Sequence, residues 1–115
     1  TEIGFRLRAR LEDRLGRASA PRYTLSTDLD ISRTSAAITP AGDITRTTLS
    51  GEATFTLRAS ATDATIATGQ VESFTSYSTT GTTVATRAAE RDAGDRLATI
   101  LADLIVTRLL ATPLP

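Results

Sequence analysis

Asp28 and Asp30 are the two side chains in this sequence whose type and spacing come nearest to an acid–base pair. They stand two positions apart, so in a strand they lie on one face about 7 Å apart, a separation that some glycosidases use. Nothing around them in the sequence forms an apolar pocket that would keep one of them protonated. We therefore interpret the pair as solubilising charges on the exposed face of a strand.

The composition limits other catalytic chemistry. The 115 residues include no Cys and no His, which excludes disulfides, thiolate nucleophiles, imidazole bases and the usual zinc, copper and haem ligands. All 13 basic residues are Arg, so the many Ser and Thr hydroxyls lack the His, Lys or Cys partner that usually activates a nucleophile. We predict a protein that is not an enzyme and that uses no cofactor or metal.

The charge balance disfavours nucleic acid as a partner. The 13 basic residues are matched by 13 acidic ones, whereas a nucleic-acid binder normally carries a basic excess.

A hydrophobic content of 40% argues for a folded chain, and no segment approaches the roughly 20 apolar residues of a membrane helix. The first residues do not read as a signal peptide, which is either absent or already removed. We expect residues 1–115 to form a single domain.

Two segments have the periodicity of amphipathic helices. Residues 2–16 carry an apolar residue every fourth position, and Gly16 followed by Pro21 favours a helix end there. Residues 84–110 form a longer helix, which Pro113 ends. Its predicted apolar face comprises Ala85, Ala89, Ala93, Leu97, Ile100, Leu101, Leu104, Ile105 and Leu109.

Three segments between the helices alternate as strands. Residues 22–32 alternate cleanly, and the blurred pattern over residues 33–38 predicts a bulge or irregular extension before the turn at residues 40–43. Residues 44–59 form the second strand of a long hairpin. After a turn at residues 60–65, residues 66–78 form the third strand, in which Gly69 is the expected bulge. The hydroxyl-rich segment 78–83 offers N-caps for the last helix.

The lengths of these elements predict an elongated α+β fold, a two-layer sandwich. Strands of about 14 residues span roughly 45 Å and the last helix about 40 Å, so two helices can lie along one face of a three-stranded antiparallel meander. The opposite face is rich in Thr and Ser, as expected for a solvated sheet or one docked on a polar wall. The expected shared core comprises Leu25, Leu29, Phe55, Leu57, Leu97, Leu101 and Leu104.

An ordered set of segments resembles the lipopolysaccharide-assembly lipoprotein family LptE. The Arg-rich first helix is followed by the strand segments 44–49 and 55–57 and then by Ser76-Tyr77-Ser78. The run Ala85-Thr86-Arg87-Ala88-Ala89-Glu90-Arg91-Asp92-Ala93 and the helix Leu101-Ala102-Asp103-Leu104-Ile105 complete the pattern. The combination covers most of the chain, although no single short motif in it is specific.

The resemblance implies a non-enzymatic lipoprotein at the periplasmic face of the Gram-negative outer membrane. Members of this family plug the lumen of the LptD β-barrel, assist its assembly and contact lipopolysaccharide. The lipidated N-terminal Cys of the family and the strand that precedes its first helix are not in this sequence. The resemblance therefore implies an N-terminal lipid anchor outside this chain and a further N-terminal sheet strand.

The resemblance also implies residues that bind lipopolysaccharide. Arg87 falls where family members carry a basic residue at the start of the last helix, and the free amides of a helix N-terminus also attract phosphate. Arg91, Arg33 and Arg46 complete the expected set. The alternative for Arg87 is a surface residue paired with Glu90, three positions on.

The hairpin tip is the expected contact with the partner. Its residues are Thr39, Pro40, Ala41, Gly42 and Asp43, which the long strands carry well away from the helix ends. An alternative function from another class is a periplasmic small-ligand or lipid carrier with a pocket between helices and sheet. A cavity of some 300 Å³ or more would favour the carrier, and a packed core would favour the plug.

Overall fold

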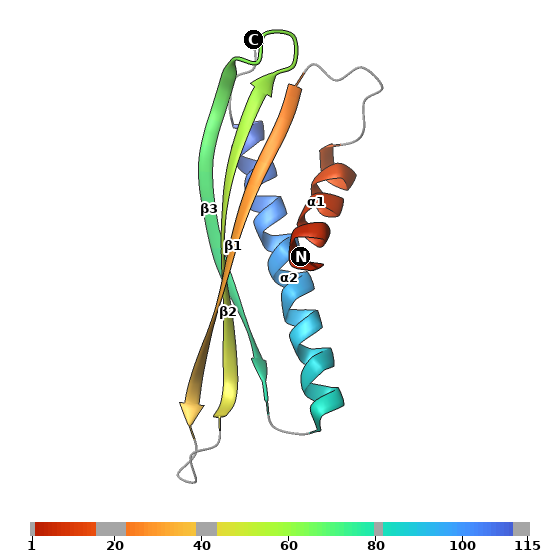
Figure 1. The fold of residues 1–115 in the computed structure, drawn as a ribbon, viewed down its shortest axis with the longest axis vertical. Coiled ribbons are helices and arrows are strands. Elements are labelled where there is room, and N and C mark those ends of the chain that lie inside the picture. Colours follow the sequence, from red (N-terminus) through yellow and green to blue (C-terminus); the bar gives the residue numbers. More distant parts are fainter. Residues whose placement is uncertain (1, 16–22, 39–43, 80–81, 112–115) are drawn as a thin grey trace.

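The computed structural model describes residues 2–15, 23–38, 44–79 and 82–111, which form two helices and three strands (Figure 1). In chain order the elements are α1 (Glu2–Leu15), β1 (Tyr23–Ile38), β2 (Ile44–Ala59), β3 (Thr65–Ser78) and α2 (Thr83–Leu110). The predicted α+β class, the antiparallel meander and the approximate bounds of all five elements are confirmed.

The strands pair in the order β1-β2-β3, antiparallel throughout. Leu29 stands opposite Ala53, which stands opposite Val71, so one face of the sheet collects the apolar side chains. Phe74 is on the other face, where 67% of its surface is exposed. In the turn between β2 and β3, Asp63 adopts a positive φ of 57°, a conformation that Asp tolerates better than most residues.

The two predicted bulges are wrong, and the sheet irregularity lies elsewhere. The register of β1 on β2 runs from Tyr23 opposite Ala59 to Ile38 opposite Ile44 without a shift. The shift instead lies between β2 and β3, where the pairing partner changes from Ala67 to Thr65 and leaves Ile66 as the extra residue. The extra residue reverses which side chains of β3 face inward beyond it. The alternation of the sequence alone had predicted this reversal at Gly69.

Gly69 has a packing role in the regular ladder. It pairs with Phe55, and a Cβ on Gly69 would lie 2.7 Å from Phe55 Cζ. The Phe55 side chain is 3% exposed and belongs to the core. Gly69 therefore leaves the space that the aromatic ring occupies.

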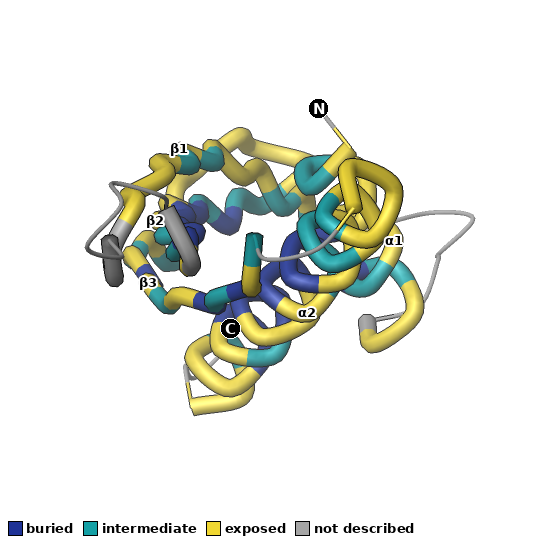
Figure 2. Tube along the Cα trace, turned by 90° about the horizontal axis from the view of Figure 1, so that it is seen from below, coloured by how far each residue is buried: buried dark blue, intermediate teal, exposed yellow. Residues whose placement is uncertain are grey.

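The helices form the second layer, with α2 against the sheet and α1 beside it (Figures 1 and 2). The contacts of α2 are with β3 and β2, whereas α1 packs chiefly on α2. The two helices run parallel, because Glu2 at the start of α1 contacts Arg91 of α2, and Arg14 near the end of α1 contacts Asp103 further along α2. On α2 the small residues Gly94, Ala98 and Ala102 recur every fourth position, and Ile3 lies against the first of them.

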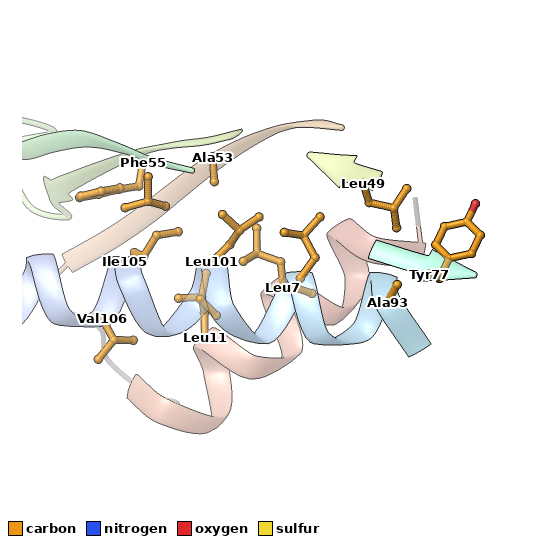
Figure 3. Close-up of a cluster of buried hydrophobic side chains, with 14 residues drawn as sticks. Leu7, Leu11, Leu49, Ala53, Phe55, Tyr77, Ala93, Leu101, Ile105 and Val106 are labelled. Carbon is orange, nitrogen blue, oxygen red and sulfur yellow. The ribbon is translucent and has the colours of Figure 1, made fainter. Parts of the chain in front are cut away.

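The core lies between α2, the sheet and the inner face of α1 (Figure 3). Leu97, Leu101 and Ile105 are fully buried, and Thr75 of β3 donates a hydrogen bond of 2.9 Å to the carbonyl oxygen of Ala93. Of the predicted core, Phe55, Leu57, Leu97 and Leu101 are buried and Leu25 and Leu29 pack partly buried against the cluster.

Leu104 is a correction to the predicted core, since 37% of it is exposed, and Ile100 is similar at 38%. An α-helix has 3.6 residues per turn, so the side chains at positions 97, 101 and 105 face the sheet, whereas those at positions 100 and 104 lie on the flank of the same helix. α1 covers the other flank of α2 through Leu7 and Leu11, and the described elements leave the flank of Leu104 open.

The molecule is elongated, as the element lengths predicted. Its extents are 59 × 23 × 19 Å and its Cα radius of gyration is 17.3 Å, against about 13 Å for a compact domain of similar size. Among the described residues, neither helix has the length and apolar character needed to span a membrane.

Candidate functional site

A groove of about 590 Å³ opens between the start of α1 and the first half of α2. We name it the helix-start groove. α1 contributes Ile3, β1 contributes Ile31 and β2 contributes Leu49, which together form an apolar floor. The complete lining is Glu2, Ile3, Ile31, Arg33, Leu49, Arg87, Glu90, Arg91, Gly94 and Asp95.

Ion pairs cross the charged rim of this groove. Arg33 of β1 pairs with Glu90 of α2 and so joins the sheet layer to the helix layer. Arg91 Nε lies 3.6 Å from Glu2 Oε1. Arg6, outside the groove, approaches Asp95 with its Nε 3.5 Å from Oδ1. Most of the rim charge is therefore compensated within the protein.

Arg87 is the exception on the rim. It is exposed, it lines the groove, and it makes no hydrogen bond or ion pair with any residue that the structure describes. The alternative expectation, a pair with Glu90, is not what the structure shows, because the Glu90 carboxylate lies on Arg33. The first turn of α2 is capped by Thr82, whose hydroxyl accepts a 3.0 Å hydrogen bond from the amide of Ala85, so the expected N-cap is confirmed.

The structure brings three of the four predicted basic residues together. Arg33, Arg87 and Arg91 share the groove although β1 and α2 are far apart in the sequence. Arg46 is not part of it: it lies an odd number of positions from the buried Leu49 of the same strand, which places it on the outer face of the sheet. The predicted partner-binding residues, Thr39 to Asp43, lie outside the described residues.

Several lining residues were not predicted from the sequence. Ile3 and Glu2 reach the groove only because α1 runs parallel to α2, and no signal in the sequence specified that direction. Ile31, on the inner face of β1, packs partly buried against the core and reaches the groove from the sheet side. Glu90 was considered only as a neighbour of Arg87, because residues three positions apart on a helix are adjacent.

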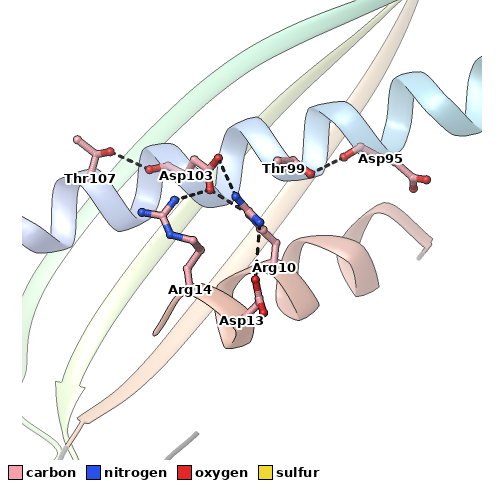
Figure 4. Close-up of polar contacts among 7 residues, drawn as sticks. All are labelled: Arg10, Asp13, Arg14, Asp95, Thr99, Asp103 and Thr107. Atoms are coloured by element: carbon pink, nitrogen blue, oxygen red, sulfur yellow. Dashed lines mark hydrogen bonds and ion pairs between the residues drawn. The ribbon is translucent and has the colours of Figure 1, made fainter. Parts of the chain in front are cut away.

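A second polar cluster fastens α1 to α2 further along the helices (Figure 4). Asp103 Oδ1 accepts hydrogen bonds from Arg10 Nε at 3.2 Å and from Arg14 Nη1 at 2.9 Å. The hydrogen bond from Arg10 is the main reason that the pKa of Asp103 lies below its ordinary value; partial burial opposes this shift, and the charge of Arg10 and the contact with Arg14 add to it. The cluster holds the parallel arrangement that forms the groove.

Comparison with known proteins identifies the family. The family model described as LptE, lipopolysaccharide-assembly, matches residues 1–109. The chain belongs to the LptE family. The resemblance seen in the sequence is thereby confirmed, and it covers nearly the whole chain. No curated protein matches this LptE-family chain.

Solved structures share the LptE-family fold. A lipoprotein from Caulobacter crescentus is 23% identical with a TM-score of 0.75, over 93% of this chain and 80% of that one. Rare lipoprotein B from Shewanella oneidensis is 16% identical with a TM-score of 0.69, over 96% and 86%. A minor lipoprotein from Acinetobacter baumannii is 17% identical with a TM-score of 0.71, over 99% and 88%. At these identities the likeness establishes the fold alone.

Membership of the LptE family supports a role in lipopolysaccharide assembly, in which the family is a non-enzymatic component. Lipopolysaccharide assembly takes place in the Gram-negative envelope, which is the setting that family membership indicates. In that setting the helix-start groove, where Arg87 meets no carboxylate of the described residues above an apolar floor, has the chemistry to hold an anionic amphiphile.

Proposed function

We propose that this protein is a lipopolysaccharide transport and assembly component of the outer membrane that contacts lipopolysaccharide at the helix-start groove. The observation that carries the proposal is the convergence of Arg33, Arg87 and Arg91 on one groove with an apolar floor. Arginine binds phosphate bidentately, and Arg87 meets no carboxylate among the described residues. Lipopolysaccharide carries phosphates next to acyl chains and so matches both parts of the groove.

The proposal extends to the partner and the location. The protein plugs the LptD β-barrel, assists its assembly, and is held at the periplasmic face of the outer membrane by an N-terminal lipid anchor outside this chain. Two observations support the plug. The molecule is slender, at 59 × 23 × 19 Å, and the outer face of its sheet presents Thr, Ser and charged side chains, which suit the polar interior of a large barrel.

The lipid contact is tested by removing the Arg87 charge. Arg87→Gln should weaken binding of lipopolysaccharide about five- to tenfold, and more strongly at low salt, because one guanidinium–phosphate contact is lost. Arg96→Gln is the matched control: it removes the same charge from α2, but Arg96 pairs with Asp92 and does not line the groove. Equal effects of the two variants, measured by isothermal titration calorimetry, would reject the site.

The partner contact is tested by crosslinking in cells. A photocrosslinker at Ala41, in the predicted partner-binding segment, should trap LptD, whereas one at the exposed Ala88 of α2 should trap it less. Copurification of a large β-barrel with the tagged chain from outer membranes is the accompanying measurement. Trapping from Ala88 alone would contradict the assigned segment, and absence of any barrel partner would contradict the plug.

A second candidate function is a periplasmic carrier of a small ligand or lipid, which the groove volume of about 590 Å³ favours. Against it, the fully buried Leu97, Leu101 and Ile105 belong to a packed core, so the groove extends only along the first half of α2. Native mass spectrometry separates the two functions. One stoichiometric small ligand on the protein and no barrel partner would favour the carrier.

A further inference from the structure

We propose that the helix-start groove takes one acyl chain of lipopolysaccharide together with a neighbouring phosphate, and that this phosphate replaces the Glu90 carboxylate on Arg33. The inference rests on the proposed function and adds to it the part of the lipid that enters the groove and the residue that limits its affinity. The step is an exchange of one anion for another on a guanidinium, so no covalent bond forms or breaks.

The apolar floor is the first observation. The floor residue Leu49 is 1% exposed, and the floor residues Ile3 and Ile31 are half-buried and pack against the core. Among the described elements α1 packs chiefly on α2, and α2 packs on β3 and β2, so the two helices cover Ile31 only in part. Gly94 adds no side chain here: a Cβ would lie 3.2 Å from Ile3 Cγ1. The resulting volume of about 590 Å³ is in the range of small-ligand sites.

The charge count of the rim is the second observation. Three guanidiniums, from Arg33, Arg87 and Arg91, face three carboxylates among the lining residues, so the groove is neutral overall. Two of the guanidiniums are held by these carboxylates, Arg33 by Glu90 and Arg91 by Glu2. A phosphate that enters finds Arg87 without a carboxylate from the described part of the chain, and it can gain a second guanidinium only by displacing a carboxylate.

Glu90 is the carboxylate that such a phosphate must displace. Its side chain is 30% exposed, whereas that of Glu2 is 60% exposed and lies at the outer start of α1. The pair that Glu90 forms with Arg33 connects α2 to β1 beside the floor residue Ile31. An acyl chain that reaches the floor from the rim therefore brings its phosphate to Arg33, where the Glu90 carboxylate now lies.

Removal of the Glu90 charge tests the exchange. Glu90→Gln should raise the affinity for detergent-dispersed lipopolysaccharide about two- to fivefold, the size of an exposed ion pair that no longer has to be broken. Asp92→Asn is the matched control, since Asp92 is two positions away on α2, pairs with Arg96 and does not line the groove. Equal gains in the two variants would overturn the proposal, because the effect would then be one of net charge alone.

A double-mutant cycle identifies Arg33 as the place of the exchange. If Glu90 competes for Arg33, Glu90→Gln should bring little or no gain when Arg33→Gln is already present. A full gain in the Arg33→Gln background would overturn the exchange. The Glu90→Asp variant keeps the charge and should bind lipopolysaccharide with the affinity of the unmodified protein. This control separates the loss of the charge from the change of side-chain shape.

The acyl part is tested with two ligands. Ile31→Ala should weaken binding of intact lipopolysaccharide about three- to tenfold, because apolar contact area is lost, and should leave binding of deacylated lipopolysaccharide unchanged. Leu29→Ala is the control, since Leu29 is a half-buried inner-face residue of the same strand that does not line the groove. Equal losses for both ligands, or no loss for the intact one, would overturn the acyl assignment.

These outcomes are separable from those of the proposed function. If Arg87→Gln binds lipopolysaccharide normally, the proposed contact fails and this inference fails with it. If Arg87→Gln weakens binding while Glu90→Gln matches Asp92→Asn, lipopolysaccharide still binds at the groove and the exchange alone is rejected.

Discussion

At the scale of the residue, Leu101 and Leu104 show how a separation of three positions on one helix changes the stability that a substitution removes. Leu101 is fully buried against the sheet, whereas Leu104 is 37% exposed on the flank of α2. Leu101→Ala should lower the free energy of unfolding by about 2 to 5 kcal/mol, because it removes buried methyl groups and leaves a cavity. Leu104→Ala should cost clearly less, and equal midpoints in urea unfolding would contradict the packing.

Asp103 makes the attachment of α1 to α2 dependent on pH. Its pKa is held below the ordinary value, chiefly by the hydrogen bond from Arg10. A group whose pKa is lower in the folded state stabilises the fold above its unfolded pKa of about 3.9, and this contribution is lost as the pH falls through the folded pKa.

Asp103→Asn should therefore destabilise the protein by about 1 kcal/mol at pH 7, a value kept small because the side chain is 39% exposed and screened by solvent. The difference in the free energy of unfolding between this variant and the unmodified protein should shrink in strong acid, where neither carries a charge at position 103. Urea unfolding at neutral pH and near pH 2 measures it. Asp13→Asn, which removes a more exposed partner of Arg10, should have almost no effect, and a difference for Asp103→Asn that persists in acid would contradict the assignment.

At the scale of the element, the same change from Gly to Ala should have different effects in β3 and α2. In β3 a Cβ on Gly69 would lie 2.7 Å from the ring of the buried Phe55, so Gly69→Ala should destabilise by about 1 to 3 kcal/mol. In α2 a Cβ on Gly94 would meet only the Ile3 side chain, 3.2 Å from Cγ1 and 3.3 Å from Cδ1, and alanine is the better helix former. Gly94→Ala should change stability by less than about 1 kcal/mol, and a larger loss there than at Gly69 would contradict both accounts.

The outer face of the sheet carries a row of like charges across all three strands. Asp30 stands opposite Glu52, and Glu52 stands opposite Glu72. Like charges directly opposite each other in a sheet are destabilising, so Glu52→Gln should stabilise the protein by about 0.2 to 1 kcal/mol, and less at high salt. Asp28→Asn is the control, because Asp28 faces the uncharged Thr54. Thermal unfolding measures the two variants. An equal gain in stability for both would mean that the effect comes from the net charge and not from the row of like charges.

At the scale of the whole molecule, the length of the strands decides the shape. Sixteen residues of β1 span roughly 50 Å at about 3.3 Å each, and the long α2 follows the same axis (Figure 1). Small-angle scattering of the free protein should give a radius of gyration close to 17 Å, the Cα value of the structure. A value near 13 Å would indicate a compact fold and would contradict this arrangement.

The local pattern of the sequence determined the elements and most of the core. A period of two placed Leu49, Ala53 and Phe55 on one face of β2, and a period near 3.6 placed Leu97 and Leu101 on one face of α2. The periods depend only on backbone geometry, so they can be recognised without the fold. The same patterns could not locate the extra residue at Ile66. A bulge anywhere between Ile66 and Val71 would produce the same change in which side chains face inward, so the sequence cannot tell these positions apart.

The tertiary structure alone decided which chemistry is brought together. The parallel packing of α1 on α2 brought Glu2 and Ile3 to the groove, and the packing of α2 on the sheet brought Glu90 to Arg33. The position of Arg46 on the outer face of the sheet kept it away from the groove. Each of these depends on contacts between segments that are remote in the sequence, and periodicity within one segment carries no information about them. The basic residues could therefore be predicted as a set, whereas their grouping around an apolar floor, with Arg87 meeting no described carboxylate, is a property of the folded chain.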